Sequence, residues 1–176
     1  MLNRGTPQGG VLSPIVWNLA FDELLDRGNQ GAVTMIGFAD DACIIARGID
    51  PETVRSIAQD AVDKAVMWGR EVGLQFNAKK TAAMVFTNKR KKPKIRNLKV
   101  AGQEIEYVDS TRYLGIELDD KLNFKVHIRS NFAKAKRFWG LKSNMVLFRI
   151  INTRWVTKNS GYFTSLHYCI AHHIQK

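Results

Sequence analysis

Apolar residues recur along the chain with two periods, and these predict an alternation of helices and strands. The i, i+3, i+4, i+7 spacing typical of an amphipathic helix occurs at residues 14–27, 51–72 and 123–141. Runs typical of strands lie at about 32–38, 42–47 and 81–87, at a hairpin of 98–101 with 105–108, and at a single strand of 113–118. This order predicts an α+β fold, an antiparallel sheet with helices on one face.

Residues at the element ends support these boundaries. Ser13 is expected to cap the first helix, with Pro14 at the first helical position, where its missing N–H is not needed. Asp50-Pro51-Glu52 opens the second helix and Gly73 closes it. About three residues, including Asp40-Asp41, separate the first two strands, and so short a link cannot join parallel strands. A tight hairpin is therefore predicted there.

Asp40 and Asp41 lie at the centre of an otherwise apolar stretch, residues 33–46. Adjacent carboxylates repel each other, and burying an unpaired carboxylate is costly. The pair therefore predicts a cation against it, most naturally a divalent metal. The alternative is that the two residues only form and cap a turn.

The positive charge is confined to the second half of the chain. The 176 residues carry a net charge of +11, but residues 1–86 hold eight Lys and Arg against ten Asp and Glu, and all of the excess follows. This asymmetry suits a polyanionic partner that binds the basic half. On charge alone, a basic surface that is only solvated explains it equally well. The length of 176 residues predicts one compact domain with an appendage. The two cysteines lack ligand spacing, and the chain shows no apolar run of about 20 residues and no signal-peptide pattern, so we expect an intracellular protein that is not inserted in a membrane.

Four segments, in order, resemble successive blocks of the reverse transcriptase palm. They are Gly5–Pro14 (GTPQGGVLSP), Phe38–Asp41 (FADD), Leu74–Thr81 (LQFNAKKT) and Tyr113–Gly115 (YLG). The resemblance covers roughly residues 3 to 142 and is most similar to non-LTR retrotransposons of animals. It implies a truncated right-hand polymerase palm over 1–88, a primer-grip-like hairpin and strand over 89–119, the start of a basic thumb helix over 120–145, and a tail at 146–176 that does not match.

The resemblance implies catalytic roles for three residues. Asp40 and, less directly, Asp41 would bind Mg²⁺ (or Mn²⁺), because polymerase chemistry needs oxygen ligands for the metal ions between the primer 3′-hydroxyl and the incoming triphosphate. Lys80 would supply charge, or a proton, to the departing pyrophosphate. Asn77 and Thr81 distinguish Lys80 from its neighbour, Lys79.

The remaining implied roles concern nucleic acid and nucleotide. The template and nucleotide contacts would come from Pro7, Gln8, Gly9 and the aromatic Phe38, which packs at the turn beside the primer end. The contacts to the primer and to the duplex backbone would come from Tyr113, Leu114, Gly115, Lys125, Arg129, Lys136 and Arg137. The implied partners are an RNA template, a DNA primer and dNTP, inside a ribonucleoprotein of the nucleus or cytoplasm; the oligomeric state stays open.

The implied function is RNA-directed DNA polymerisation by a fragment of a retrotransposon reverse transcriptase. The family carries a third metal-binding acid on a strand before the Pro7-Gln8-Gly9 block, where this chain has only four residues before Gly5. We therefore expect the chain alone not to polymerise; Mg²⁺-dependent extension of an RNA-templated primer by the purified chain would contradict this. The alternative is a non-catalytic nucleic-acid-binding remnant. A phosphohydrolase that uses the two aspartates leaves the other blocks unexplained, and His167, Cys169, His172 and His173 fit no tetrahedral zinc pattern.

Overall fold

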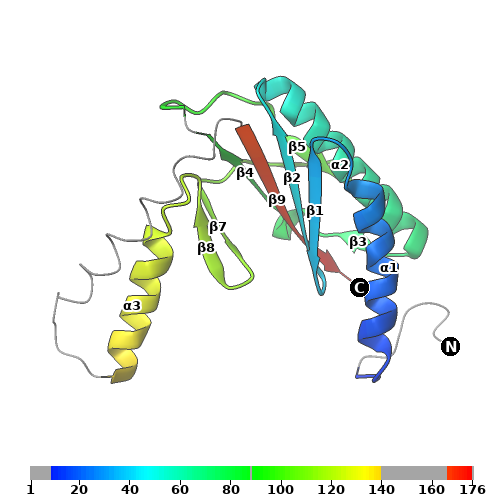
Figure 1. Ribbon diagram of the computed structural model, residues 1–176, viewed down its shortest axis with the longest axis horizontal. Helices are drawn as coiled ribbons and strands as arrows, with labels where there is room; N and C mark the ends of the chain where they lie inside the picture. The colour runs from blue at the N-terminus through cyan, green and yellow to red at the C-terminus, as the bar shows by residue number, and fades with distance from the viewer. Residues whose placement is uncertain (1–8, 88, 140–165, 176) are drawn as a thin grey trace.

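The structure, a computed structural model, describes residues 9–87, 89–139 and 166–175. These residues form an α+β fold (Figure 1). The helices are α1 (Ser13–Gly28), α2 (Pro51–Val72) and α3 (Lys125–Trp139), with a short 3₁₀ helix at Ala78–Lys80. The strands are β1 (Val33–Phe38), β2 (Asp41–Gly48), β3 (Gln75–Phe76), β4 (Ala82–Phe86), β5 (Leu98–Val100), β6 (Gln103–Ile105), β7 (Ser110–Tyr113), β8 (Ile116–Asp119) and β9 (Leu166–Gln175). Within these ranges no helix is both long and apolar enough to cross a bilayer.

The main sheet contains five strands, and its centre is the C-terminal strand. β1 and β2 form the predicted antiparallel hairpin. β9 pairs antiparallel with β2 on one side and with β4 and β3 on the other. Sequence analysis gave residues 146–176 only as a tail that does not match the family and predicted no strand there; residues 166–175 form this central strand, and residues 146–165 lie outside the described residues. Local patterns could not reveal β9, because its partners lie about 80 to 130 residues away in the sequence.

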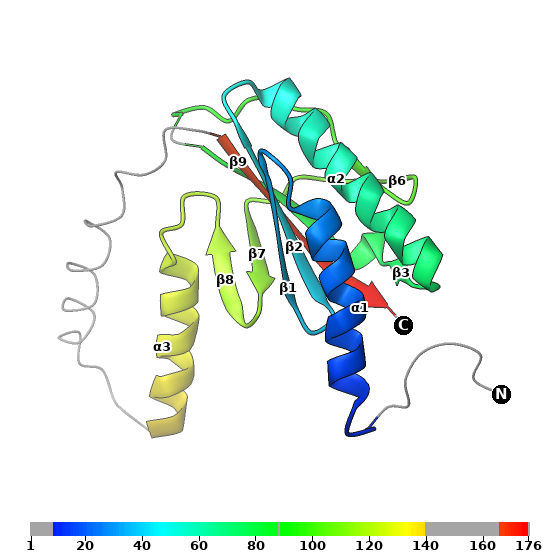
Figure 2. The same ribbon diagram turned by 45° about the vertical axis from the view of Figure 1, so that its right-hand side comes forward.

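α1 and α2 pack side by side on the sheet, as Figure 2 shows. The two helices meet through Phe21 of α1 and Trp68 of α2, whose rings contact edge to face with centroids 6.0 Å apart. Trp17 stacks on Phe21, with ring centroids 5.6 Å apart. Beneath them the core continues into Met35 of β1 and Ile44 of β2, which are register partners and buried. The hairpin is thus held from one face by two helices.

A glycine in β1 allows α1 to approach the hairpin. A Cβ added at Gly37 would lie 2.0 Å from Cε1 of Phe21, so we expect Gly37→Ala to lower the free energy of unfolding by about 1–3 kcal/mol through overpacking. Urea denaturation measures this loss. In a Phe21→Ala background the obstructing ring is absent, and the same substitution should cost much less. Equal losses in the two backgrounds would contradict the contact.

The helices α1 and α2 begin differently. The prediction that Ser13 caps α1 is wrong: Ser13 is the first helical residue, the cap position belongs to Leu12, and no side chain caps this end. Pro14 does lie in the first turn, as predicted. α2 begins as predicted, because Asp50 Oδ2 accepts a hydrogen bond from the Thr53 backbone N–H at 2.8 Å. Gly73 ends α2 at φ 78°, a left-handed conformation suited to glycine.

The Asp50 cap makes stability depend on pH. Hydrogen bonds from the Thr53 backbone N–H, and then from its hydroxyl, hold the pKa of Asp50 below its ordinary value of 3.8. A carboxyl group with a lowered folded pKa stabilises the fold fully above its unfolded pKa, and this stabilisation is lost as the pH falls through the folded pKa. Asn keeps an acceptor but does not titrate. The difference in thermal midpoint between the wild type and Asp50→Asn should therefore shrink below about pH 4; a constant difference would contradict this cause.

Two small hairpins, β5–β6 and β7–β8, follow β4 in the chain, and both differ in detail from the prediction. In the first, β6 spans residues 103–105 rather than 105–108, and Gln59 of α2 anchors β5 by bonding both the N–H and the carbonyl of Lys99. The second replaces the predicted single strand 113–118. Leu114 (φ 47°) and Gly115 (φ 82°) form a turn between β7 and β8. Two positive φ values in succession are the signature of a tight hairpin turn, which the apolar residues on either side concealed.

Candidate functional site

The two aspartates lie at the tip of the β1–β2 hairpin. Phe38 and Asp41 are the last register pair, so that Ala39 and Asp40 form a two-residue turn, with Ala39 at φ 53°. Asp40 is exposed and Asp41 is half-buried. The cost of burying an unpaired carboxylate therefore does not apply to Asp40, because an exposed carboxylate keeps its hydration. An exposed tip is nevertheless where a carboxylate can reach a metal ion held by another molecule.

A hydrogen bond ties this turn to the first helix. The Trp17 indole N–H donates to the carbonyl oxygen of Ala39 at 2.6 Å, while its ring stacks on Phe21. Sequence analysis placed Trp17 within the first predicted helix, residues 14–27, and gave it no partner. The available signal was the residue type, since a partly buried tryptophan usually finds an acceptor for its single N–H. The first helix, which follows the Pro7-Gln8-Gly9 block, is thus bonded to the aspartate turn, and the two form one unit.

The residues expected to meet template and nucleotide are only partly described. Pro7 and Gln8 lie outside the described residues, and Gly9 is exposed, with φ 87° and open space where a side chain would be. Phe38 is 62% exposed, so its ring stands in solvent at the turn. Several large apolar side chains of α1 and the residues before it are also exposed: Val11, Leu12, Ile15, Val16 and Leu19.

Lys80 lies in a short turn held by its neighbours. Asn77 Oδ1 accepts from the Lys79 backbone N–H at 3.0 Å, and the Thr81 hydroxyl donates to the Asn77 carbonyl oxygen at 2.8 Å. The Lys80 backbone N–H donates to the same carbonyl at 3.0 Å. Asn77 and Thr81 therefore shape the 3₁₀ turn, and both lysine side chains are exposed.

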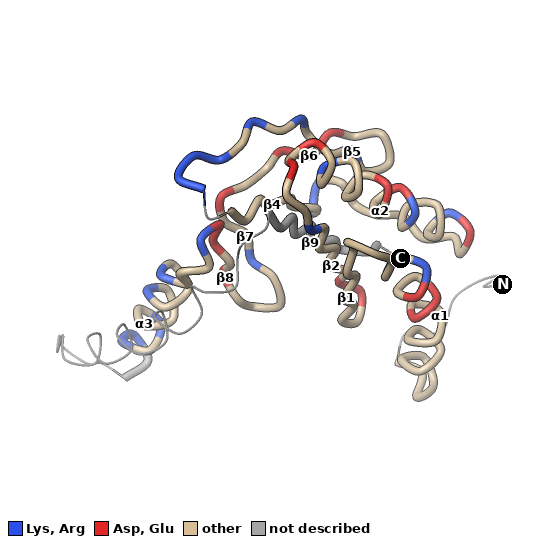
Figure 3. The backbone as a smooth tube through the Cα atoms, turned by 45° about the horizontal axis from the view of Figure 1, so that its top comes forward, with Lys and Arg blue, Asp and Glu red and all other residues tan. Residues whose placement is uncertain are grey.

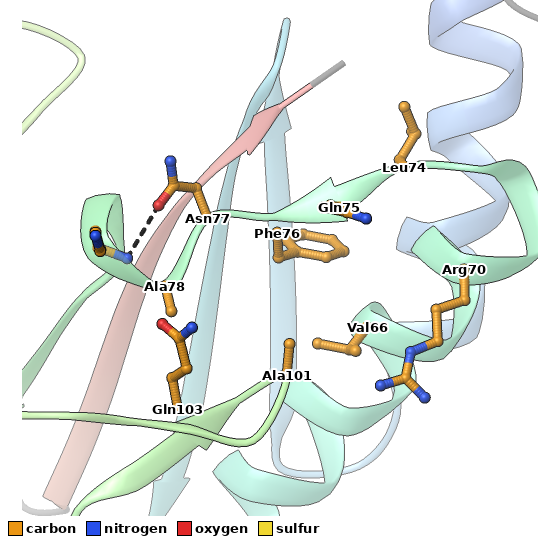
Figure 4. Close-up of a pocket in the computed structure, with 10 residues that line it drawn as sticks. Val66, Arg70, Leu74, Gln75, Phe76, Asn77, Ala78, Ala101 and Gln103 are labelled. Atoms are coloured by element: carbon orange, nitrogen blue, oxygen red, sulfur yellow. Dashed lines mark hydrogen bonds between the residues drawn. The ribbon is translucent and has the colours of Figure 1, made fainter.

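A pocket of about 430 Å³ opens beside this turn, between α2, β3 and the β5–β6 hairpin (Figure 4). Its charged lining residues are Arg70 and Lys79, and no acidic residue lines it. Phe76, which is buried, also belongs to the lining. Lys79 and not Lys80 belongs to this pocket, so the two adjacent lysines serve different surfaces.

The sheet register places the aspartate turn and the Lys80 turn at the same end of the sheet. β2 and β4 both run antiparallel to β9, and Cys43 and Ala82 are opposite the same residue, Ala171. With one strand between them, their Cα atoms are roughly 10 Å apart. Asp41 precedes Cys43 by two residues, and Lys80 precedes Ala82 by two. The structure therefore brings together the second and third blocks, which are 39 residues apart in sequence from Asp41 to Lys80.

The donor atoms at this end fit a hard divalent cation. Mg²⁺ retains several waters and is usually held by one or two carboxylates together with substrate phosphates, so Asp40 and Asp41 are a suitable set. Among the described residues, no group of three or more His, Cys, Asp or Glu side chains is arranged to hold a metal ion. The two carboxylates would therefore rely on water, phosphate or other groups to complete the coordination.

The predicted nucleic-acid surface forms a separate arm of the structure, made by β7, β8 and α3 (Figure 1). α3 contains five Lys or Arg and no Asp or Glu, and Figure 3 shows basic residues along α3 and along the segment that precedes β5. Lys125, Arg129, Lys136 and Arg137 are all exposed. At the turn of the arm, Leu114 is 45% exposed, while Tyr113 is half-buried.

Two carboxylates that sequence analysis did not single out support this arm: Asp119 links β8 to the start of α3, and Asp120 links the arm to Lys92. Asp119 accepts hydrogen bonds from the backbone N–H groups of Asn123 (3.0 Å) and Phe124 (2.7 Å), just before α3. Asp120 pairs with Lys92 at 2.9 Å, and Asp109 pairs with it too. Burial lowers the pKa of Lys92, but the bonds and charges of these two carboxylates outweigh burial and raise it. Lys92 therefore has a structural role in the basic segment.

Comparison with known proteins identifies the family of the chain. The sequence model of the family described as "Reverse transcriptase (RNA-dependent DNA polymerase)" matches residues 1–118. A retrovirus-related Pol polyprotein from the type-1 retrotransposable element R1 of Nasonia vitripennis is 31% identical over 165 residues, which cover 91% of this chain and 47% of that protein.

Other relatives come from Drosophila melanogaster. The putative 115 kDa protein in the type-1 retrotransposable element R1DM is 32% identical over 88% of the chain and 14% of its own length. The RNA-directed DNA polymerase from the mobile element jockey is 27% identical over 76% of the chain and 15% of its own length. The chain thus spans less than half the length of these relatives. No solved structure matches it. With two thirds of its residues matched by the family model, this chain belongs to the reverse transcriptase family.

Proposed function

We propose that this chain carries the metal-binding turn and the duplex-binding arm of an RNA-directed DNA polymerase. The hydrogen bond from Trp17 to the Ala39 carbonyl is the observation that carries this proposal. It couples the helix after the template block to the turn with Asp40 and Asp41, so a template held by one would be in fixed register with metal ions held by the other. Fixed geometry of this kind is a large part of polymerase catalysis.

In this proposal, Asp40 and Asp41 would hold Mg²⁺ or Mn²⁺. When bound, the metal neutralises charge on the phosphates and lowers the pKa of the attacking hydroxyl. The β1–β2 hairpin keeps the two carboxylates at a rigid tip, with Asp40 as the main ligand. Lys80, exposed at the same end of the sheet, supplies positive charge where the leaving group departs. Phe38 presents an open aromatic face beside the turn.

The proposed organisation follows the family. Residues 1–88 would be part of the palm, 89–119 the primer-gripping hairpins and 120–145 the start of the thumb. Pro7, Gln8 and Gly9 would contact the RNA template. The five cations of α3, with no carboxylate among them, support contacts with the phosphates of the template–primer duplex. The Tyr113-Leu114-Gly115 turn would approach the primer strand, and dNTP would bind between the palm residues and the template.

Metal binding at Asp40 tests this proposal directly. We expect Mn²⁺ to broaden the amide NMR signals of residues 39–42 selectively, and Asp40→Asn to weaken this binding at least about tenfold, because one of two anionic carboxylate ligands becomes a neutral amide. Mg²⁺ should compete with Mn²⁺. The matched control is Asp22→Asn, which removes an exposed carboxylate of α1 that is outside the turn. Equal affinities of the wild type and Asp40→Asn would refute the metal role.

The same variants separate polymerase from simple nucleic-acid binding, the alternative that the basic α3 favours. Both functions predict that affinity for an RNA–DNA duplex falls steeply with salt and is the same in Asp40→Asn without metal. Only the polymerase function predicts that metal binds at the turn. Salt-sensitive duplex binding by a chain with no metal affinity at residues 39–42 would favour the binding remnant.

A further inference from the structure

The pocket between α2, β3 and the β5–β6 hairpin is formed by segments that are far apart in the sequence. α2 contributes Val66 and Arg70, the chain after α2 contributes residues 74–79, and the hairpin contributes Ala101 and Gln103 (Figure 4). Its volume of about 430 Å³ falls within the range of small-molecule sites in proteins, roughly 300–1,000 Å³. None of the described lining residues belongs to the aspartate turn. The pocket is therefore a second candidate site.

The backbone fixes two walls of this pocket. A Cβ added at Gly69 would lie 3.0 Å from Cε2 of Phe76 and 3.1 Å from the carbonyl oxygen of Leu74, so the absence of a side chain lets the segment after α2 return against the helix. On the opposite wall, Ala101 (φ 49°) and Gly102 (φ 84°) form the turn of the β5–β6 hairpin. Two positive φ values in succession are typical of a tight hairpin turn.

The charge of the lining is positive and is not compensated nearby. Its two cationic side chains, both exposed, are those of Arg70 and Lys79. No ion pair within the described ranges involves either of them. The acids that adjoin lining residues in the sequence pair elsewhere, Glu71 with Arg27 at 2.8 Å and Glu104 with Lys99 at 4.0 Å. The pocket therefore favours an anionic ligand.

The carbonyl groups at the end of α2 do not oppose this preference. The last carbonyls of a helix carry partial negative charge when they lack hydrogen-bond partners. Here the Gly69 carbonyl accepts from the Leu74 N–H at 2.7 Å, and the Arg70 carbonyl accepts from the Gly73 N–H at 3.3 Å. An anion beside this helix end would therefore meet the Arg70 guanidinium rather than unpaired oxygens at these two positions.

The rest of the lining combines apolar surface with amide side chains. The apolar part includes Val66, Leu74 and Phe76, and the exposed amides are those of Gln75 and Gln103. A glutamine amide can donate and accept a hydrogen bond at once, as the edge of a nucleobase requires. Apolar side chains suit the faces of a base, and cationic side chains suit a phosphate. A nucleoside phosphate presents all three kinds of group.

From this lining we propose that the pocket binds a nucleoside phosphate, with its phosphate on Arg70 and Lys79 and its base against the apolar residues and the glutamine amides. The aspartate turn takes no part, so binding needs no divalent metal and does not rest on the polymerase function proposed above. A free nucleotide and an unpaired nucleotide of an RNA strand present the same groups, and the experiment separates these two sources.

Titration of the full chain with AMP in the presence of EDTA tests this site. We expect the amide NMR signals of residues 74–79 and 101–103 to shift selectively, and those of residues 39–42 to stay in place. Adenosine and inorganic phosphate, which each present only part of the ligand, should bind at least about tenfold more weakly than AMP. Arg70→Gln and Lys79→Gln should each weaken AMP binding at least about tenfold, because each removes a charge-assisted hydrogen bond to the phosphate.

Three control variants should bind AMP as the wild type does. Lys80→Gln changes the adjacent lysine, which is outside the lining, and Lys64→Gln changes a cation of α2 that bonds Gln30 instead. Asp40→Asn separates this site from the metal site, so that either proposal can fail without the other. Because all substituted side chains are exposed, unchanged thermal midpoints should show that the variants fold.

A short single-stranded oligoadenylate, titrated in the same way, identifies the source of the nucleotide. If it shifts the same signals and binds more tightly than AMP, the site takes a nucleotide of an RNA strand; if AMP binds more tightly, the site takes the free nucleotide. No shift of the pocket signals with either probe would overturn the proposal. Equal affinity for AMP and inorganic phosphate would overturn it too, as would equal losses in Lys79→Gln and Lys80→Gln.

Discussion

Replacing Asp40 with Asn should reduce RNA-templated primer extension by about 1,000-fold, the largest effect that we expect. The assay uses a chimera in which residues 1–118 replace the matching segment of the jockey RNA-directed DNA polymerase, so that the remaining parts come from that protein. Losing a negatively charged oxygen ligand removes both a metal-binding group and the compensation of the metal charge. A 1,000-fold loss corresponds to about 4 kcal/mol of activation free energy.

Two other carboxylate variants show whether the loss of activity is specific to Asp40. Asp41→Asn should have a smaller effect, because the family assigns the second acid a less direct role. Asp22→Asn, on the exposed surface of α1, should extend primers as the unmodified chimera does. Extension by the Asp40→Asn chimera within a few-fold of the unmodified chimera would show that the turn does not hold the catalytic metal. The effect should also persist at saturating dNTP, since the substitution acts on the chemical step.

Trp68→Ala should destabilise the fold by about 3–5 kcal/mol, the range found when a large buried aromatic residue is truncated. Trp68 is 1% exposed and contacts Phe21 of α1 edge to face. The cavity would lie where both helices meet the sheet, and domains are typically stable by only about 5–15 kcal/mol. Urea denaturation with matched m-values measures the change.

Two further substitutions identify the cause of this loss. The adjacent Met67 is 59% exposed, so Met67→Ala should change stability by no more than about 0.5 kcal/mol. Trp68→Phe keeps an aromatic ring and removes an indole N–H that is buried without an acceptor among the described residues. It should therefore cost clearly less than the alanine variant. If Trp68→Ala and Met67→Ala had similar effects, Trp68 would not be the central contact between the helices and the sheet.

The features that local sequence predicted correctly are those with local causes. The helical spacing over 51–72, the Asp50 cap and the Gly73 end gave α2 with the predicted bounds. The short link around Asp40 gave the β1–β2 hairpin. The errors also have local causes: the apolar residues on both sides of Leu114-Gly115 fitted one strand as well as two, and the Ser13 cap assumed a helix that begins one residue later than it does.

Contacts between distant segments were beyond such patterns. The bond from Trp17 to Ala39 joins residues 22 apart, and the two bonds between Gln59 and Lys99 join residues 40 apart. β9 is the clearest example, since its central position depends entirely on pairing with β2 and β4. The exposure of Asp40 at the hairpin tip could likewise be decided only by the packing around it.

The sequence by itself determined the reverse transcriptase blocks, their order, the α+β class and the separation of a basic second half from a nearly neutral first half. These follow from residue types, short spacings and charge counts, which act locally. The tertiary structure decided which blocks meet, that Asp41 and Lys80 share one end of the sheet, and that the C-terminal strand completes it. The physical reason is that hydrogen bonds between strands link backbone groups, which every residue carries, so the choice of partner depends on the whole fold.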